Sequence, residues 1–195
     1  HYVFRHQSTP FDNWRTDLVV ERVSDVNYFQ DYGTTLRQTA RQFLRSSATL
    51  RGVGRYWDFE LMADDFQVID ESVRPENEPY RRVPRAAFWM DQPLGLGGLT
   101  FGLDSEVVAF DRDVGVTGAR VDLFPSLYWD RYHRWGFVKP LVGYRYTSYD
   151  LDYRGQPGDE SPSRGAAIGS LDAGLVFDRY TSDGGYQTLE PRLYY

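Results

Sequence analysis

Cysteine is absent from the 195 residues, and lysine occurs only once, at Lys139. The absence of cysteine excludes a disulfide scaffold or a thiolate metal site within this stretch. The chain also lacks any apolar run of the roughly 18 residues that a transmembrane helix needs. Its formal net charge of −6 provides no bulk attraction to nucleic acid, so we expect no nucleic-acid partner.

Helical periodicity is scarce as well. Even the stretch 35–44 has too few apolar positions at helical spacing to need a helix. Aromatic residues, by contrast, make up 16% of the chain, with 15 tyrosines and 5 tryptophans beside 18 glycines. Aromatic side chains favour strands and glycine disfavours helices, so the composition predicts an all-β fold.

Apolar and polar residues alternate with a period of two along most of the chain. The alternation predicts about nine antiparallel strands of about 9 to 14 residues, which suits strands tilted across a bilayer as part of a larger barrel. In a transmembrane β-barrel, one parity faces lipid and the other faces the lumen. The predicted lipid-facing residues are Leu99, Phe101, Leu103, Leu123, Trp129, Tyr144, Leu175 and Phe177. The predicted lumen-facing residues are Asp104, Glu106, Asp122, Arg145, Glu190 and Arg192.

The connections between these runs alternate in length. Short ones are expected near residues 8–13, 57–58, 92–97, 130–135 and 181–185. Longer ones are expected near 24–42, 70–79 and 150–165, with a shorter member of this group at 111–117. Short turns at one rim and longer loops at the other are typical of outer-membrane β-barrels.

Four prolines lie inside or at the start of these apolar runs. Pro84, Pro125, Pro140 and Pro191 all fall on the apolar parity of their predicted strands. Proline cannot donate a hydrogen bond to a β-ladder, so each position requires a bulge, a skipped bond or an edge.

Several motifs that could carry chemistry are better explained by ordinary structure. Asp111 to Gly115 resembles the start of a calcium loop but lacks the later glycine and glutamate of that motif. Gly95 to Gly98 precedes a strand where a phosphate-binding loop precedes a helix. His6 and His133 have no second ligand at metal spacing, and the adjacent carboxylates Asp64-Asp65 point to opposite faces of a strand. We therefore expect no catalytic residue, no metal and no cofactor, and a protein that is not an enzyme.

Two stretches resemble a known family. Tyr186 to Arg192 contains QTLEPR, and Val23 to Phe29 together with Asp31 contains the pattern VSDxxYFxD. Both resemble the barrel domain of the lipopolysaccharide-assembly protein LptD, and Phe66 to Val68 is similar to the same family's pattern. The resemblance predicts that residues 1–195 form part of an LptD-like barrel domain. Because His1 opens directly on strand-like residues, we expect a middle portion of that barrel.

The resemblance also implies a location and partners. It implies a barrel in the outer membrane of a Gram-negative bacterium that delivers lipopolysaccharide to the outer leaflet. The implied partners are lipopolysaccharide, outer-membrane lipid, an LptE-like lipoprotein plug inside the barrel, and an LptA-like periplasmic bridge. The bridge-contacting jellyroll, the lateral gate and the domain-linking cysteines are expected outside these residues.

Two alternatives remain open from the residues alone. One is a different outer-membrane channel or porin-like barrel built on the same alternation. The other is a soluble β-sandwich that binds carbohydrate through its tyrosines, in which the apolar faces would be buried against each other.

Overall fold

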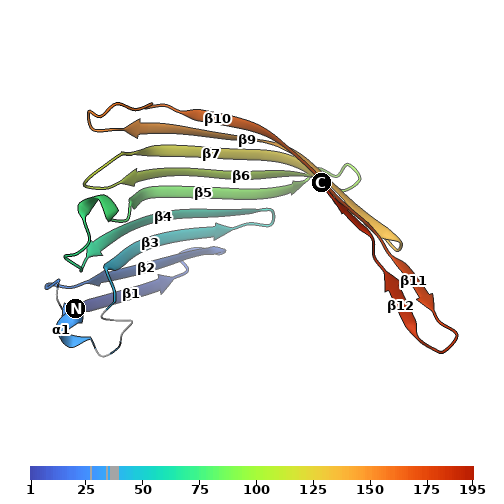
Figure 1. Cartoon of the computed structure of the whole chain (residues 1–195), viewed down its shortest axis with the longest axis horizontal. Helices are drawn as coiled ribbons and strands as arrows, with labels where there is room; N and C mark the ends of the chain where they lie inside the picture. Colours follow the sequence, from blue (N-terminus) through green and yellow to red (C-terminus); the bar gives the residue numbers. More distant parts are fainter. Residues whose placement is uncertain (27, 34, 36–39) are drawn as a thin grey trace.

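The computed structural model describes residues 1–26, 28–33, 35 and 40–195. Its main element is an 11-stranded sheet in the order β1-β2-β3-β4-β5-β6-β7-β9-β10-β13, with β8 paired to β9, and every pairing is antiparallel (Figure 1). A separate two-stranded ribbon, β11-β12, extends from one end of this sheet. The all-β antiparallel prediction is confirmed. Since β1 and β13 do not pair with each other, the sheet is open and is compatible with a segment of a larger barrel.

The strands follow the chain order with few interruptions. They are β1 (Tyr2–Ser8), β2 (Trp14–Arg22), β3 (Phe43–Val53), β4 (Trp57–Val68), β5 (Arg81–Pro93), β6 (Leu99–Asp111), β7 (Thr117–Trp129), β8 (Arg131–His133), β9 (Gly136–Asp152), β10 (Ser163–Leu175), β11 (Phe177–Tyr180), β12 (Tyr186–Leu189) and β13 (Arg192–Tyr194). Two short helical segments join them, the helix α1 (Tyr28–Tyr32) and the 3-10 turn η1 (Pro75–Asn77).

Nine of these strands are long, which matches the predicted number. They are β1 to β7, β9 and β10; seven of them have 9 to 13 residues, within the predicted range, whereas β1 has 7 and β9 has 17. The sequence did not predict the short strand β8, nor the division of the last hairpin into β10-β11 and β12-β13. A proline lies at each of these two interruptions. Pro140 lies opposite the end of β7, where β8 separates from it, and Pro191 lies opposite the end of β10, where the last hairpin divides.

The prolines are accommodated in the two ways that the sequence suggested. At Pro84, strand β5 carries one extra residue between Arg82 and Arg85 relative to both of its neighbours, which is a β-bulge. At Pro125, Pro140 and Pro191 the ladder is interrupted without a change of register on the two sides of the gap. The bulge shifts the parity of β5, so Arg82 and Arg85 project from the same face of the sheet.

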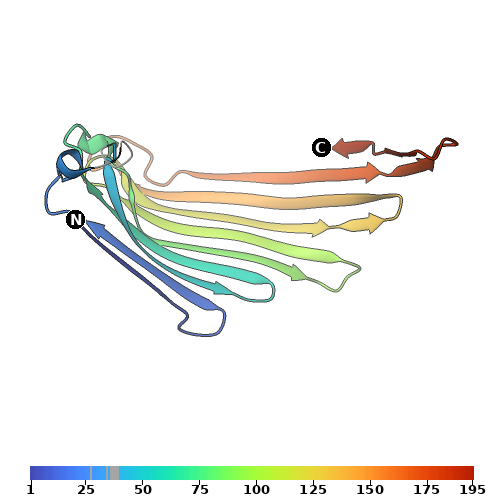
Figure 2. The ribbon, with the colours of Figure 1, turned by 90° about the horizontal axis from the view of Figure 1, so that it is seen from below.

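The two ends of the strands differ as predicted. The longer connections, with α1 and η1, gather at one end, and the short turns lie at the other (Figures 1 and 2). The prediction of a turn at residues 57–58 is wrong. The connection is residues 54–56, and Trp57 already belongs to β4. Helix α1 was not predicted within the loop at 24–42, and residues 27, 34 and 36–39 of that loop lie outside the described part.

Burial is sparse because the sheet forms a single layer. The buried apolar cluster, formed by Val23, Phe29, Leu44 and Ile69, lies where the loop that carries α1 meets the ends of β3 and β4. The sheet's own apolar face remains exposed, with Val142 at 59% and Tyr144 at 52% relative exposure. No helix within the described residues is long and apolar enough to cross a membrane.

Candidate functional site

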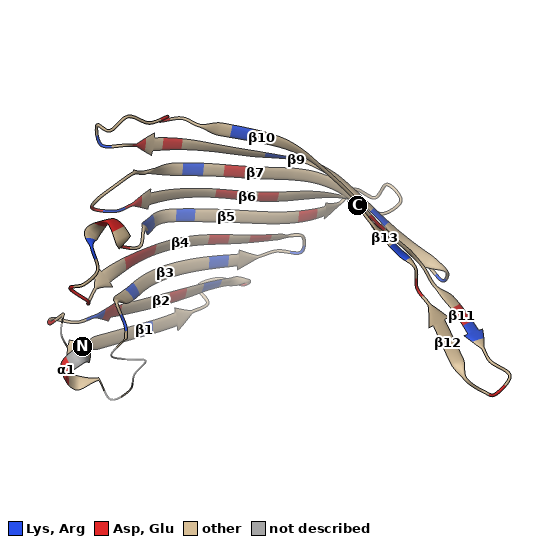
Figure 3. Ribbon diagram, in the orientation of Figure 1, with Lys and Arg blue, Asp and Glu red and all other residues tan. Residues whose placement is uncertain are grey.

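The candidate site is the polar face of the sheet. Charged residues occur along the length of the strands as well as in the loops (Figure 3). Strand register brings its predicted members into adjacent positions. Glu106 of β6 lies opposite Asp122 of β7, and Asp122 lies opposite Thr147 of β9. Asp104 and Arg145 occupy the same parity on β6 and β9. The predicted polar residues of β6, β7 and β9 therefore share one face and lie close together.

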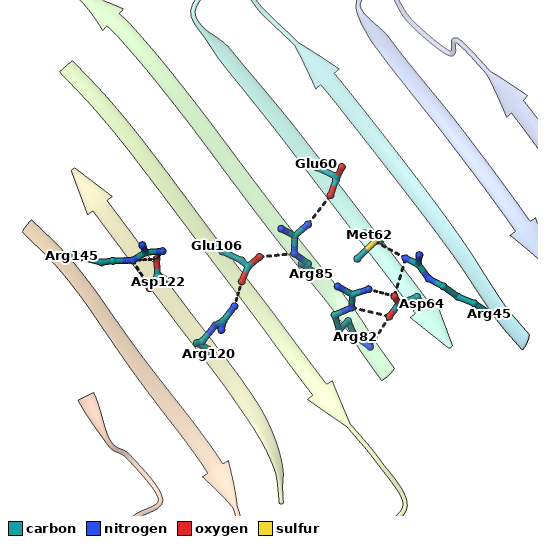
Figure 4. A network of polar contacts seen from close by, with 10 residues as sticks. All are labelled: Arg45, Glu60, Met62, Asp64, Arg82, Arg85, Glu106, Arg120, Asp122 and Arg145. Atoms are coloured by element: carbon teal, nitrogen blue, oxygen red, sulfur yellow. Dashed lines mark hydrogen bonds and ion pairs between the residues drawn. The ribbon is translucent and has the colours of Figure 1, made fainter. Parts of the chain in front are cut away.

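An ion-pair ladder crosses this face perpendicular to the strands. Arg85 of β5 donates to Glu60 of β4 at 2.7 Å and to Glu106 of β6 at 2.6 Å. Glu106 in turn accepts a hydrogen bond from Arg120 of β7 (Figure 4). The side chains of Arg85 and Glu106 are only 19% and 21% exposed. Each carboxylate is thus neutralised by arginine from a neighbouring strand, which offsets the cost of partial burial.

The ladder continues towards the C-terminus as separate pairs. Arg145 donates to Asp122 at 2.8 Å, and the Thr147 hydroxyl donates to the same carboxylate at 2.6 Å. Farther along, Arg192 of β13 forms two hydrogen bonds with Asp172 of β10, at 2.7 and 2.6 Å. Arginine suits these positions because its planar fork engages a carboxylate through two donors.

Asp64 forms the most buried ion pairs on this face, although it is not among the predicted lumen-facing residues. Its side chain is fully buried and lies 3.0 Å from the Arg45 guanidinium. It also accepts hydrogen bonds from the Arg82 guanidinium and, at 3.0 Å, from the Arg82 backbone N–H. Arg82 reaches Asp64 just before the bulge at Pro84, where the sequence does not reveal the parity. The adjacent Asp65 contacts Arg22 instead, in agreement with opposite strand faces for the two carboxylates.

Two predicted polar residues have no ion pair with any described residue. Asp104 is exposed and borders a hollow of about 350 Å³ that Trp89, Arg85, Glu106 and Arg145 also line. Glu190 lies between β12 and β13, outside any strand, and is exposed. The hollow at Asp104 combines an aromatic ring with charged groups of both signs.

The opposite face carries the predicted apolar residues. Leu99 of β6 lies opposite Trp129 of β7, and Leu103 lies opposite Pro125. The other predicted positions of the main sheet, Phe101, Leu123, Tyr144 and Leu175, lie on the same face by register. Phe177 keeps this parity but lies on the β11-β12 ribbon, outside the main sheet. No second layer covers this face within the described residues, which is unlike a β-sandwich.

The remaining motifs take structural positions. Asp111 and Asp113 of the calcium-loop-like stretch hold Arg81, at 2.9 and 2.5 Å. Arg112 in the same loop donates to the Glu76 carbonyl at 2.7 Å, so it joins two long loops. In the loop that contains η1, hydrogen bonds from Ser72 and Gln42 lower the pKa of Asp70. These contacts order the long-loop rim.

The fold and its two faces define a class. A single antiparallel sheet of long strands, apolar on one face and ion-paired on the other, with short turns at one rim and long loops at the other, is typical of the wall of a transmembrane β-barrel.

Comparison with known proteins identifies the family within this class. The sequence model of the family described as "LPS transport system D" (LptD) matches residues 1–195, and the chain belongs to the LptD family. It is 37% identical over 187 residues to the LPS-assembly protein LptD of Nitrosospira multiformis, covering 91% of this chain and 20% of that protein. It is 35% identical to the LptD of Alkalilimnicola ehrlichii, covering 93% of this chain and 25% of that protein. The matching LptD of Nitrosococcus oceani is 34% identical, covering all of this chain and 27% of that protein. The chain thus spans about a fifth to a quarter of the length of these relatives.

Proposed function

We propose that this chain forms part of the wall of an LptD barrel in the outer membrane of a Gram-negative bacterium, and that the complete protein assembles lipopolysaccharide there. The observation that carries the proposal is the match to the LptD family along the whole chain. The two-faced sheet supports it, because the apolar face suits contact with lipid and the ion-paired face suits a polar lumen.

In this proposal the polar face has two partners. The exposed parts of the face, above all Asp104 and the hollow beside it, contact the sugar-rich headgroup of lipopolysaccharide or the surface of an LptE-like lipoprotein plug. An LptA-like periplasmic bridge delivers the lipid to another part of the protein. The chain itself acts by position and polarity, as a non-enzymatic wall of the transport path.

A pair of adjacent residues tests the orientation and the function together. A photo-crosslinking amino acid is placed at Asp104 or at Leu103 of the complete protein in cells that depend on it. We expect the probe at Asp104 to crosslink lipopolysaccharide or the lipoprotein, and the probe at Leu103 to crosslink only phospholipid or nothing. The two sites differ by one residue on the same strand, so local structure and expression are matched. Equal crosslinks to lipopolysaccharide or lipoprotein from both positions, or none from Asp104, would contradict the proposal.

A further inference from the structure

An apolar hollow of about 780 Å³ lies at the short-turn end of the sheet, around the ends of β7, β8, β9, β10 and β13. A single cross-strand row forms its floor. Arg131 lies opposite Val138, Val138 opposite Ala173, and Ala173 opposite Leu193. By register this row belongs to the apolar face of the sheet. The hollow therefore opens on the side that the proposed function assigns to lipid, and the inference below rests on that proposal.

Local sequence explains why the face is hollowed here. Ala173 places a small side chain between the larger Val138 and Leu193 of the neighbouring strands. Pro191, also in the lining, lies at the interruption between the β10-β13 ladder and the β11-β12 ladder. The small side chain of Ala173 and the interrupted ladder leave a space within the size range of ligand sites.

Cationic and aromatic groups surround the opening. The Arg131 guanidinium lies over the Trp129 ring, 4.7 Å from its centroid. The His133 ring stacks on Trp135, with centroids 5.1 Å apart and planes 1° apart. Neither Arg131 nor His133 forms an ion pair with any described residue, in contrast to the arginines of the ion-pair ladder. Tryptophan at the end of a membrane strand is typical of the level of the lipid headgroups.

We propose that this hollow is a binding site for an anionic glycerophospholipid of the leaflet at the short-turn rim. An acyl chain occupies the apolar floor along Val138, Ala173 and Leu193. The phosphate lies at the opening, where Arg131 donates to it and His133 provides a second donor. The two tryptophans flank the glycerol region, where their rings meet both apolar and polar surroundings.

The test compares crosslinked lipid at two positions of the complete protein in vesicles that mix phosphatidylglycerol with phosphatidylcholine. A photo-crosslinking residue at Leu193 captures lipid inside the hollow, and one at Val142 captures lipid on the apolar face outside it. Mass spectrometry of the adducts gives the ratio of the two lipids at each site. We expect Leu193 to enrich phosphatidylglycerol about fivefold over Val142, which corresponds to the roughly 1 kcal/mol that one basic residue contributes at an anionic surface.

Two variants identify the groups responsible. Arg131→Gln should remove most of the enrichment at Leu193. The matched control is Arg55→Gln, which removes one arginine from another short turn, outside the lining of the hollow. Ala173→Phe should fill the floor and reduce crosslinks of either lipid at Leu193 while leaving those at Val142 unchanged.

The outcomes separate this inference from the proposed function. If Val142 crosslinks no lipid, the apolar face is not in the membrane, and both proposals fail. If Val142 crosslinks lipid while Leu193 shows no preference, or if Arg55→Gln lowers the preference as much as Arg131→Gln does, only the binding site is refuted.

Discussion

Replacing Asp64 by alanine should be among the most destabilising single changes on the polar face. The carboxylate is fully buried and neutralises Arg45 and Arg82, while also accepting the Arg82 backbone N–H. Removing one partner from a buried ion pair costs about 3–5 kcal/mol. Here the two arginine side chains are 47% and 38% exposed and can partly rehydrate, so we expect a cost of about 2–3 kcal/mol.

The matched control is Asp17→Ala on β2 of the same face. Asp17 pairs with Arg15 at 2.9 Å, but their side chains are 34% and 58% exposed. Solvent screens such an exposed pair, so we expect its loss to shift the unfolding midpoint much less than the loss of Asp64. Urea unfolding of the complete protein in detergent, followed by the loss of the compact form on unheated gels, gives the two shifts. If Asp64→Ala shifts the midpoint no more than Asp17→Ala does, the buried ion pairs do not stabilise the sheet and the reasoning is refuted.

Two further predictions concern the faces of the sheet. Leu103→Arg should lower stability by roughly 2–4 kcal/mol if the residue lies near the bilayer midplane, whereas Asp104→Asn should have a much smaller effect; equal losses of assembled barrel in the two variants would contradict the assignment of faces. Gly52→Val should cost about 1–3 kcal/mol, because the Trp14 ring would lie 2.8 Å from a Cβ there. The control for Gly52→Val is Gly169→Val, since the nearest atom to a Cβ at position 169 is 3.9 Å away. A similar unfolding midpoint for the two variants would show that the Trp14 ring does not require glycine at position 52.

The alternation of residues was sufficient to predict the antiparallel strands and to group Asp104, Glu106, Asp122 and Arg145 on one face. It could do so because a strand has a fixed period of two. The alternation could not show which of the two adjacent aromatic residues, Phe88 or Trp89, lies on the polar face. The register places Trp89 opposite Asp104 on the polar face, and Phe88 opposite Ser105 on the other.

The prolines show a second limit of the sequence. A proline in a strand lacks the N–H of the ladder and is accommodated by a bulge or by an interruption of the ladder. The local sequence does not specify which of the two occurs. At Pro84 the chain inserts a residue, and the parity of β5 changes. At Pro125 the ladder is merely interrupted, and the parity of β7 is kept. The ion pair of Arg82 with Asp64 depends on the bulge at Pro84, and the hollow beside Pro191 depends on the interrupted ladder there. Neither could be predicted without the strand register.

The ion-pair ladder has a consequence for how the barrel assembles. If one strand slides by two residues along its neighbour, every side chain keeps its face, so hydrophobicity alone cannot distinguish the slipped sheet from the correct one. The slipped sheet would, however, move Arg85 away from Glu60 and Glu106. The charged pairs therefore favour one register between β4, β5, β6 and β7, a choice that the alternation of apolar residues alone does not determine.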